Sequence, residues 1–505
     1  MNSSVLRRTL LAISIAALLA GVGAAARAEV EPNSLFTDGA VLQQGVALPV
    51  WGAGKDGEQI IVKIQDQTAS TTVRDGRWLV RLKPMKAGGP FTMTITGDNT
   101  ITITNLLVGE VWLCSGQSNM AFHLARAANA AEAIAAAGDS QLRLFTVLSG
   151  ATDTPKTEVA GSWKESSPET ARGFSAVAWF FGRELRRALK VPIGLINSSV
   201  GGTPAEAWTS RAALEAYPEL REILERYAER VKNFDPEAAA ARHQRAREAH
   251  KQAVVKARAA GEKPPPAPRA PADPRKAQVR PCCLYNAMIA PLEPYAIAGA
   301  IWYQGESNSG RAAEYQKLFP AMIRDWRQAW GQGDSPFFFV QIAPHERIIP
   351  EIREAQLLTW QKVPRTGMAV ITDVGNETDI HPTKKEPVGA RLALAARAIA
   401  YGDNIEYSGP VFSSMKVAGD RALLNFTHLG SGLMAKDGEL KGFTIAGADG
   451  SFVAAKAVID GDIVVVSSPS VPQPVAVRYG WANTPNVNLF NKDGLPATPF
   501  RTDVK

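Results

Sequence analysis

The first candidate reactive side chains of the sequence lie in a short segment around residue 118. An apolar run from Val111 to Cys114 stops at the polar sequence Ser-Gly-Gln-Ser-Asn, residues 115–119. A buried strand followed at once by small and amide residues is how an α/β enzyme carries a serine off the end of its sheet. We therefore consider Ser118 as a nucleophile, with Gln117 and Asn119 as neighbours that could support it. Serine and asparagine are also good helix N-caps, so the segment alone fits a polar turn equally well.

A serine hydroxyl becomes a useful nucleophile only when a base takes its proton. The chain has six histidines, and His381 stands in the segment DVGNETDIHPT, directly after a predicted strand. Asp379 lies two residues earlier, and in an extended turn its carboxylate can reach the imidazole, fix its tautomer and stabilise the imidazolium. An isolated Asp-x-His is more often an ordinary loop, and His123 and His345 are the alternative bases.

An acyl-transfer site also needs hydrogen-bond donors for the developing oxyanion. The glycine pair Gly201-Gly202 follows a predicted strand and can present backbone N–H groups without side-chain obstruction. Gln304 follows another predicted strand and carries an amide donor, and the Ser118 backbone could supply one more. Taken alone, a glycine pair is more often just a tight turn. All these segments come at the carboxyl ends of predicted strands, where open α/β sheets bind ligands.

Strands and helices alternate between residues 108 and 405, which predicts an α/β domain with a mostly parallel sheet and helices on both faces. Its predicted strands include VWLC, LRLFTV, VPIGLINSS, FFFVQIA and MAVITDV, and its predicted helices cover 125–137, 174–189 and 387–401. The regions 29–107 and 406–505 contain short β-branched strands separated by glycine, aspartate and asparagine turns. Each is predicted to form a small β-sandwich that flanks the α/β domain.

A basic insert, residues 232–280, interrupts the α/β domain. It holds twelve Lys and Arg against five Asp and Glu, and it combines an Ala/Arg/Lys-rich helix with the connector PPPAPRAPADP. We favour a solvated surface excursion; the functional alternative is a contact with anionic lipid or polysaccharide. Because the insert accounts for the whole positive charge of the chain beyond residue 28, the net charge of +7 does not indicate a nucleic-acid-binding protein.

The first 28 residues read as a secretory signal peptide. A basic pair, Arg7-Arg8, precedes an apolar run, and Ala26-Arg27-Ala28 forms an A-x-A cleavage site. We expect cleavage after Ala28 and an exported protein, periplasmic or secreted, with no integral membrane segment afterwards; an uncleaved anchor is the alternative. The chain has only three cysteines, and no cysteine and histidine spacing resembles a zinc site.

Four blocks taken together are far more specific than any one of them. GQSNM, GGTPAEAW, WYQGESN and DIHP, in this order, resemble the sialate O-acetylesterase-like branch of the SGNH hydrolases. The resemblance extends over roughly residues 30–505 apart from the basic insert. It implies an α/β/α three-layer sheet, a carbohydrate acetylesterase activity, and no metal or cofactor.

The resemblance also implies residue roles. Ser118 would attack the acetyl carbonyl, His381 would take the proton, and Asp379 would orient the imidazole. The oxyanion would be held by the Ser118 backbone, by a glycine of the pair 201–202 and by the Gln304 amide.

The block that contains Gln304 departs from the wider superfamily, where an asparagine usually fills the last oxyanion position. Asn308 lies four residues beyond Gln304. Glu306, between them, would either orient the loop or contribute a carboxylate to the site.

The substrate is less closely defined than the reaction. Trp208, Trp302 and Tyr303 lie in or near the predicted site loops and could stack on a sugar, although such aromatics are as often core. Arg353 could pair with the carboxylate of an O-acetylated sialic acid. An acetylated xylan, another hemicellulose or a pectin would need no such arginine. A non-catalytic carbohydrate-binding protein and, ranked lower, a lipase-like esterase are the remaining alternatives.

Overall fold

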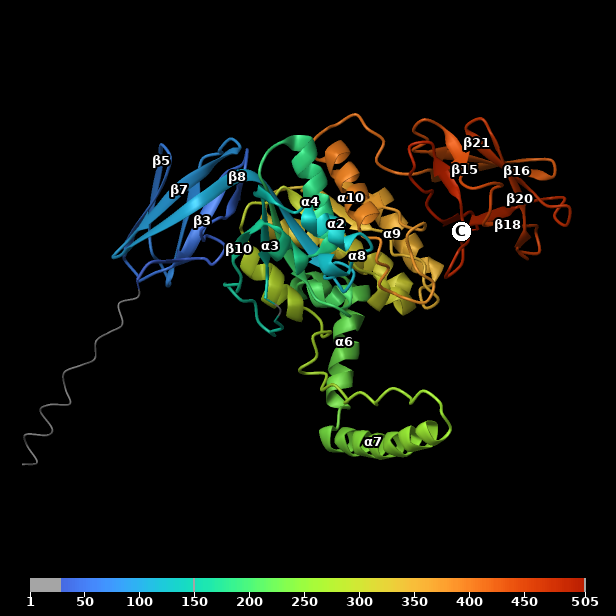
Figure 1. Cartoon of the computed structure of the whole chain (residues 1–505), viewed down its shortest axis with the longest axis horizontal. Coiled ribbons are helices and arrows are strands. Elements are labelled where there is room, and N and C mark those ends of the chain that lie inside the picture. Colours follow the sequence, from blue (N-terminus) through green and yellow to red (C-terminus); the bar gives the residue numbers. More distant parts are fainter. Residues whose placement is uncertain (1–28, 149, 504–505) are drawn as a thin grey trace, which may run out of the picture.

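The computed structural model describes residues 29–148 and 150–503, so the predicted signal peptide lies outside the described residues. Three regions follow one another along the long axis of the molecule: an N-terminal β region, a central α/β region and a C-terminal β region (Figure 1). The long helix α7 stands apart from all three. No helix within the described residues is long and apolar enough to cross a membrane.

The central sheet is built around β8 (Thr100–Gly116), whose last eleven residues, 106–116, are all buried. On its two sides, β11 (Ile193–Ser199) and β12 (Gly299–Tyr303) run parallel to it. Continuous apolar strands of this kind are typical of sheets covered on both faces. The full strand order is β10-β9-β11-β8-β12-β13-β14, with β9 (Asp139–Thr146), β13 (Phe337–Val340) and β14 (Thr366–Ala369) parallel and the edge strand β10 (Trp163–Ser166) antiparallel.

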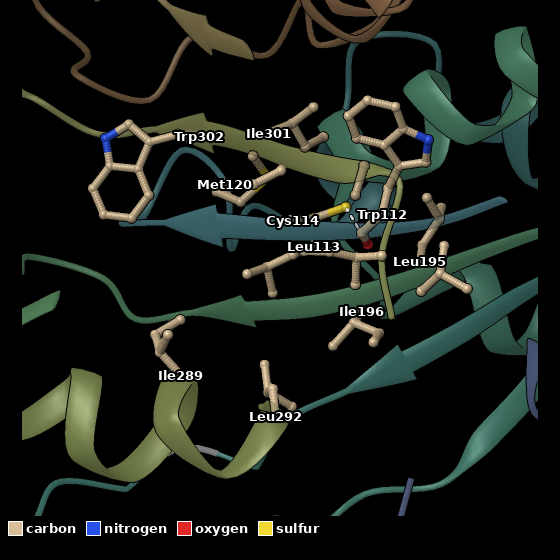
Figure 2. Close-up of a cluster of buried hydrophobic side chains, with 14 of the residues drawn as sticks. Trp112, Leu113, Cys114, Met120, Leu195, Ile196, Ile289, Leu292, Ile301 and Trp302 are labelled. Carbon is tan, nitrogen blue, oxygen red and sulfur yellow. Dashed lines mark hydrogen bonds between the residues drawn. The ribbon is translucent and has the colours of Figure 1, made fainter. Parts of the chain in front are cut away.

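Helices α4 (Ala176–Leu189) and α8 (Ala312–Trp330) cover opposite faces of this sheet. Trp112 of β8 packs on α4, with its ring 5.1 Å from that of Phe181. Trp302 of β12 packs on α8, with its ring 5.7 Å from that of Trp326. Trp302 is in register with Ser115, three residues after Trp112, and an odd separation along a strand reverses the face. Figure 2 shows Trp112 and Trp302 among the buried side chains of the core.

The other helices of the central region connect these strands. The helix predicted at 174–189 is confirmed as α4, whose first turn is capped by the Ser175 side chain accepting from Ala178 N. The helix predicted at 125–137 is shorter, since only α2 (Ala130–Ala135) is α-helical there. The remaining α-helices are α3 (Pro168–Arg172), α5 (Arg211–Ala216), α6 (Pro218–Lys232), α9 (Pro350–Lys362) and α10 (Glu386–Ile399), and α10 packs along α4.

The N-terminal β region shares a strand with the central sheet. The first half of β8 pairs antiparallel with β7 (Gly88–Thr96), and its second half pairs with β11 and β12. The domain boundary predicted after residue 107 therefore falls inside one continuous strand. The other strands of this region are β1 (Glu31–Pro32), β2 (Val41–Gln43), β3 (Leu48–Ala53), β4 (Gln59–Ile64), β5 (Gln67–Thr72) and β6 (Arg77–Leu82).

The basic insert projects from the central region as α7 (Pro236–Ala259), which is joined to the body through α6 (Figure 1). Only Ala239 and Ala257 of α7 are buried. Its largely exposed surface agrees with the polar sequence from which the excursion was predicted.

The C-terminal β region has a hydrophobic core of its own, centred on residues such as Leu424, Val466 and Tyr479. The three cysteines of the chain are buried free thiols. The strands of this region are β15 (Val411–Ala418), β16 (Arg421–Thr427), β17 (Leu433–Ala435), β18 (Phe443–Ala446), β19 (Val453–Ala454), β20 (Lys456–Asp460), β21 (Ile463–Ser467), β22 (Ala476–Tyr479), β23 (Leu489–Asn491) and β24 (Phe500–Arg501).

Candidate active site

The carboxyl ends of β8, β11 and β12 meet at Gly116. Val200 N donates to Gly116 O at 3.1 Å, and Gln117 N donates to Tyr303 O at 3.0 Å. Gly116 has a φ of +137°, and a Cβ added there would lie 2.2 Å from Tyr303 O. Only glycine fits this close approach, so the backbone turns sharply as it leaves the sheet.

Ser118 lies in the turn that follows Gly116. Met120 N and Ala121 N both donate to Gln117 O at 2.9 Å, and the Ser118 side chain remains partly exposed. The next helical turn does not start until Leu124, with His123 at its N-cap position. Ser118 is therefore not a helix cap, and it lies partly exposed just beyond the end of the central strand.

Gly201 lies directly beside Ser118. A Cβ added to Gly201 would be 3.4 Å from Ser118 Cβ, and both glycines of the pair 201–202 are exposed. Within residues 29–148 and 150–503, no acceptor takes the backbone N–H of Ser118, Gly201 or Gly202. These donors are therefore available to a ligand next to the hydroxyl.

The glycine loop is held from behind by Trp208. Thr203 Oγ1 donates to Val200 O at 2.8 Å, and Trp208 Nε1 donates to Thr203 Oγ1 at 2.9 Å. Trp208, Trp302 and Tyr303 are completely buried, so the prediction that they form a sugar-binding surface is wrong. Trp208 instead supports the loop that lies beside Ser118.

The loop that carries His381 contacts the serine turn. Asn119 Nδ2 donates to Ile380 O at 2.9 Å, which places the residues after Ser118 against the residue before His381. His381 Nδ1 lies 3.8 Å from Asp379 Oδ1, and that oxygen accepts from His381 N at 2.9 Å. The carboxylate is close to the imidazole without a hydrogen bond to it. Contacts of this kind are often long before a substrate binds.

The pKa of His381 is lowered from its ordinary value. Partial burial of the ring is the largest cause, and the positive charges of Lys385 and Arg126 act in the same direction, whereas Asp379 opposes the shift. A lowered pKa keeps the imidazole neutral, which is the form that can accept a proton from serine.

Gln304 is placed differently from the prediction. Its Nε2 donates to Asn308 Oδ1 at 2.7 Å and to Thr203 O at 3.2 Å, and the side chain is completely buried. Both hydrogens of the amide are therefore used inside the protein. Asn308 extends the same network, since its Oδ1 also accepts from Ala205 N and its Nδ2 donates to Glu206. In this arrangement Gln304 and Asn308 tie the glycine loop to β12 and do not present a donor to an oxyanion.

Glu306 belongs to a buried polar group beside Ser118. Asn119 Nδ2 donates to Glu306 Oε1 at 2.6 Å, and Lys385 Nζ donates to Asn119 Oδ1 at 2.5 Å. The Lys385 ammonium also lies over the rings of Phe122 and Tyr303, at 4.8 and 5.1 Å. The contacts show that Glu306 holds Asn119, which agrees with the orienting role considered from the sequence.

Burial shifts both charged members of this group towards their neutral forms. The pKa of Lys385 is lowered to about 7, mainly by burial, and Glu306 opposes that shift. The pKa of Glu306 is raised, again mainly by burial. Lys385 was missed from the sequence, where a lysine four residues after His381 looks like a surface residue. Its burial depends on the packing of α10 and could not be read from local pattern.

The two remaining predicted site residues have structural contacts. Gln117 Oε1 accepts from Ser307 N at 3.3 Å, which joins the serine turn to the loop after β12. Arg353 is fully buried and donates to Ala482 O. It has no surface with which to meet a substrate carboxylate, so that predicted role is wrong. His345, one of the alternative bases, is also buried, and its Nδ1 accepts from Arg347 N.

The family of this chain follows from its similarity to known proteins. The family described as "Carbohydrate esterase, sialic acid-specific acetylesterase" matches residues 108–257 and 276–398. The chain belongs to this family. The two matched stretches contain all four sequence blocks, and the gap between them, residues 258–275, falls within the basic insert.

Relatives of this carbohydrate esterase extend over most of its length. Sialate O-acetylesterase of Mus musculus is 32% identical over 515 residues, with 90% of this chain and 91% of that protein covered. The Rattus norvegicus protein of the same name is 33% identical, with 75% of each chain covered. A solved carbohydrate acetylesterase from Xanthomonas citri is 39% identical with a TM-score of 0.81, and covers 94% of this chain and 100% of that chain. The chain is thus a carbohydrate esterase, and its relatives support hydrolysis of carbohydrate O-acetyl esters.

Proposed function

We propose that this carbohydrate esterase removes O-acetyl groups from sialic acids through an acetyl-enzyme on Ser118. The observation that carries the proposal is the placement of Ser118. Ser118 is partly exposed at the end of the central strand, Gly201 lies beside its Cβ, and Asn119 binds the His381 loop. A nucleophile, unobstructed backbone donors and a neutral imidazole are the parts that acyl transfer requires.

The reaction proceeds in two steps. Ser118 Oγ attacks the acetyl carbonyl carbon while His381 takes the hydroxyl proton, and the carbonyl oxygen becomes an oxyanion. The sugar C–O oxygen then leaves with the proton from His381, which gives free sugar and acetyl-Ser118. Water, deprotonated by His381, attacks the acetyl-enzyme and releases acetate and the regenerated serine.

The backbone N–H groups of Ser118 and of the glycine pair 201–202 are the proposed oxyanion donors. They are free of other acceptors among the residues described and lie beside the nucleophile. Gln304 was the third donor expected from the sequence, and its internal hydrogen bonds favour a supporting role instead.

Two features bear on the substrate. The family description and the names of the two rodent relatives support a sialic acid. The Xanthomonas citri protein is described only as a carbohydrate acetylesterase, which keeps an acetylated xylan, another hemicellulose or a pectin as the second candidate. The accessible Ser118 speaks against a binding protein without activity.

Acetate release from a substrate panel tests this proposal. We expect 9-O-acetylated sialic acid to be hydrolysed with a higher kcat/KM than acetylated xylan or acetylated pectin, and Ser118→Ala to lose at least about 10⁴-fold in the rate of acetate release from each of them. Preferred hydrolysis of xylan or pectin would move the assignment to the second candidate. A loss below tenfold in Ser118→Ala would overturn the proposed mechanism.

We also propose that the protein is exported, on the strength of its first 28 residues. N-terminal sequencing of the protein from fractionated producing cells should find a chain that begins at Glu29 outside the cytoplasm. An intact Met1 in the cytoplasmic fraction would refute export.

A further inference from the structure

A cavity of about 440 Å³ opens beside the glycine pair 201–202, which adjoins Ser118. Gly202 and Ser307 line its inner wall. Gly202 follows the glycine that touches Ser118, and Ser307 N binds the side chain of Gln117, the residue before Ser118. The cavity therefore adjoins the two segments that contact the serine turn.

The outer wall of the cavity comes from α6 and is cationic and aromatic. It presents Arg226, Tyr227 and Arg230, and Arg311 joins them from the loop before α8. The guanidinium carbon of Arg230 lies 6.0 Å from the centre of the Tyr227 ring. Aromatic faces pack against pyranose rings, and guanidinium groups bind carboxylates.

Two of these three arginines already have carboxylate partners. Arg226 donates to Glu314 at 2.8 Å. Arg311 donates to the other oxygen of Glu314 at 3.0 Å and to Glu206 at 2.7 Å. Arg230 makes no ion pair with any residue in the described part of the chain, and it is exposed at the cavity rim. One positive charge in the lining is therefore unmatched.

We propose that this cavity is the sugar subsite and that Arg230, placed over Tyr227, binds the carboxylate of an acidic sugar. The inference rests on the proposed function, because it takes the acetyl group of the same substrate to be at Ser118. It replaces Arg353, the arginine expected from the sequence, which is buried against the C-terminal region. Because α6 leads directly into the basic insert, the residue that selects the substrate is carried on the helix that supports α7.

The test compares one substrate with and without its negative charge. We would measure kcat/KM for 9-O-acetyl-N-acetylneuraminic acid and for its methyl ester, in wild type, Arg230→Gln and Arg242→Gln. Arg242 is an exposed arginine of α7 outside the cavity, and it is the matched control. Thermal unfolding of each variant checks its fold.

We expect wild type and Arg242→Gln to prefer the free acid over the methyl ester by about 5- to 10-fold, as befits one partly exposed charged contact. In Arg230→Gln, kcat/KM for the free acid should fall to about the value for the methyl ester, while kcat/KM for the ester stays unchanged. Equal rates on acid and ester in wild type would overturn the proposal, and so would a preference that survives Arg230→Gln.

A second substrate separates this inference from the proposed function. 4-Nitrophenyl acetate carries the acetyl group without a sugar, so its hydrolysis depends on Ser118 and not on the carboxylate subsite. If wild type hydrolyses it through Ser118 but treats acid and methyl ester alike, the subsite is refuted and the reaction stands. If wild type hydrolyses no acetyl ester, both are refuted.

Discussion

Replacing Asp379 by asparagine tests how the carboxylate acts on His381. The two groups are 3.8 Å apart, and the Asp379 side chain is 59% exposed. In a water-like dielectric, opposite charges at this separation interact by about 1.1 kcal/mol. That energy corresponds to a pKa change of about 0.8 units for the imidazole and to about a sixfold change in rate.

Asp379→Asn should therefore shift the acid limb of the kcat/KM profile down by about 0.8 pH units. The limb moves down because Asp379 favours the protonated imidazole, and loss of its charge lowers the pKa of His381 further. At pH above the limb, kcat/KM should fall by about sixfold, because the imidazolium formed in the transition state loses a stabilising charge. Asparagine keeps the oxygen that accepts from His381 N.

The assay is kcat/KM for 4-nitrophenyl acetate between pH 5 and 9, with Glu377→Gln as the control. Glu377 is an exposed carboxylate of the same loop, and its variant should leave the limb in place. A loss near 10⁴-fold would contradict the calculation and show that Asp379 hydrogen-bonds the imidazole in the working enzyme. An unshifted limb, or an equal shift in Glu377→Gln, would remove Asp379 as the partner of His381.

The remaining predictions concern Ser118, Lys385 and the glycine pair 201–202. Ser118→Ala should lower kcat by about 10⁴- to 10⁶-fold without changing the unfolding temperature; a loss below tenfold would exclude the acetyl-enzyme. Lys385→Met removes a positive charge near His381, so the acid limb should move to higher pH, opposite to the Asp379 variant; a downward shift would contradict the assignment. The pKa of Lys385 is about 7 in the folded protein and about 10.4 in the unfolded chain. The free energy of unfolding of wild type should therefore rise relative to that of Lys385→Met as the pH increases between these two values. Parallel plots of unfolding free energy against pH for the two proteins would contradict the burial of Lys385. Gly201→Ala places a methyl group 3.4 Å from Ser118 Cβ and should lower kcat/KM at unchanged stability. Gly202→Ala, at a φ of +72°, should cost about 1 kcal/mol of stability. A stability loss in Gly201→Ala together with a loss of kcat/KM at unchanged stability in Gly202→Ala would refute this geometry.

The backbone around the site could be predicted from sequence because it depends on local pattern. The apolar run before Ser118 ends in small residues, which marks a strand that leaves the sheet. Gly201 likewise follows an apolar strand, and parallel strands bring their carboxyl ends to one edge. The contact between these two residues follows from that topology.

The roles of individual side chains were harder to predict because they depend on tertiary burial. Trp208 and Arg353 have the chemistry to bind a sugar, but packing against α8 and the C-terminal region removes both from the surface. Gln304 has the right amide, yet its donors are satisfied by Thr203 and Asn308. The reverse holds for Lys385, which looks solvated in the sequence but is buried, with its Nζ donating to Asn119, the residue after Ser118.

In the fold, too, features that depend on local sequence pattern were predictable and features that depend on tertiary contacts were not. The alternation of strands and helices predicts the mixed α/β core, and the glycine-rich β-branched segments predict the flanking sheets. The continuity of β8 through the predicted boundary was not visible, because a strand of 17 residues that changes partners midway has no signal in hydrophobic pattern alone.

Trapping the acetyl-enzyme would show directly whether Ser118 is the nucleophile. Wild type and Ser118→Ala would be mixed with an activated acetyl ester, quenched in acid within the burst phase and digested for mass spectrometry. We expect one acetyl group per wild-type chain, on the peptide that contains Ser118, and none on that peptide in the variant. An active wild-type enzyme that carries its acetyl group on another residue, or carries none at any time, would exclude Ser118 as the nucleophile.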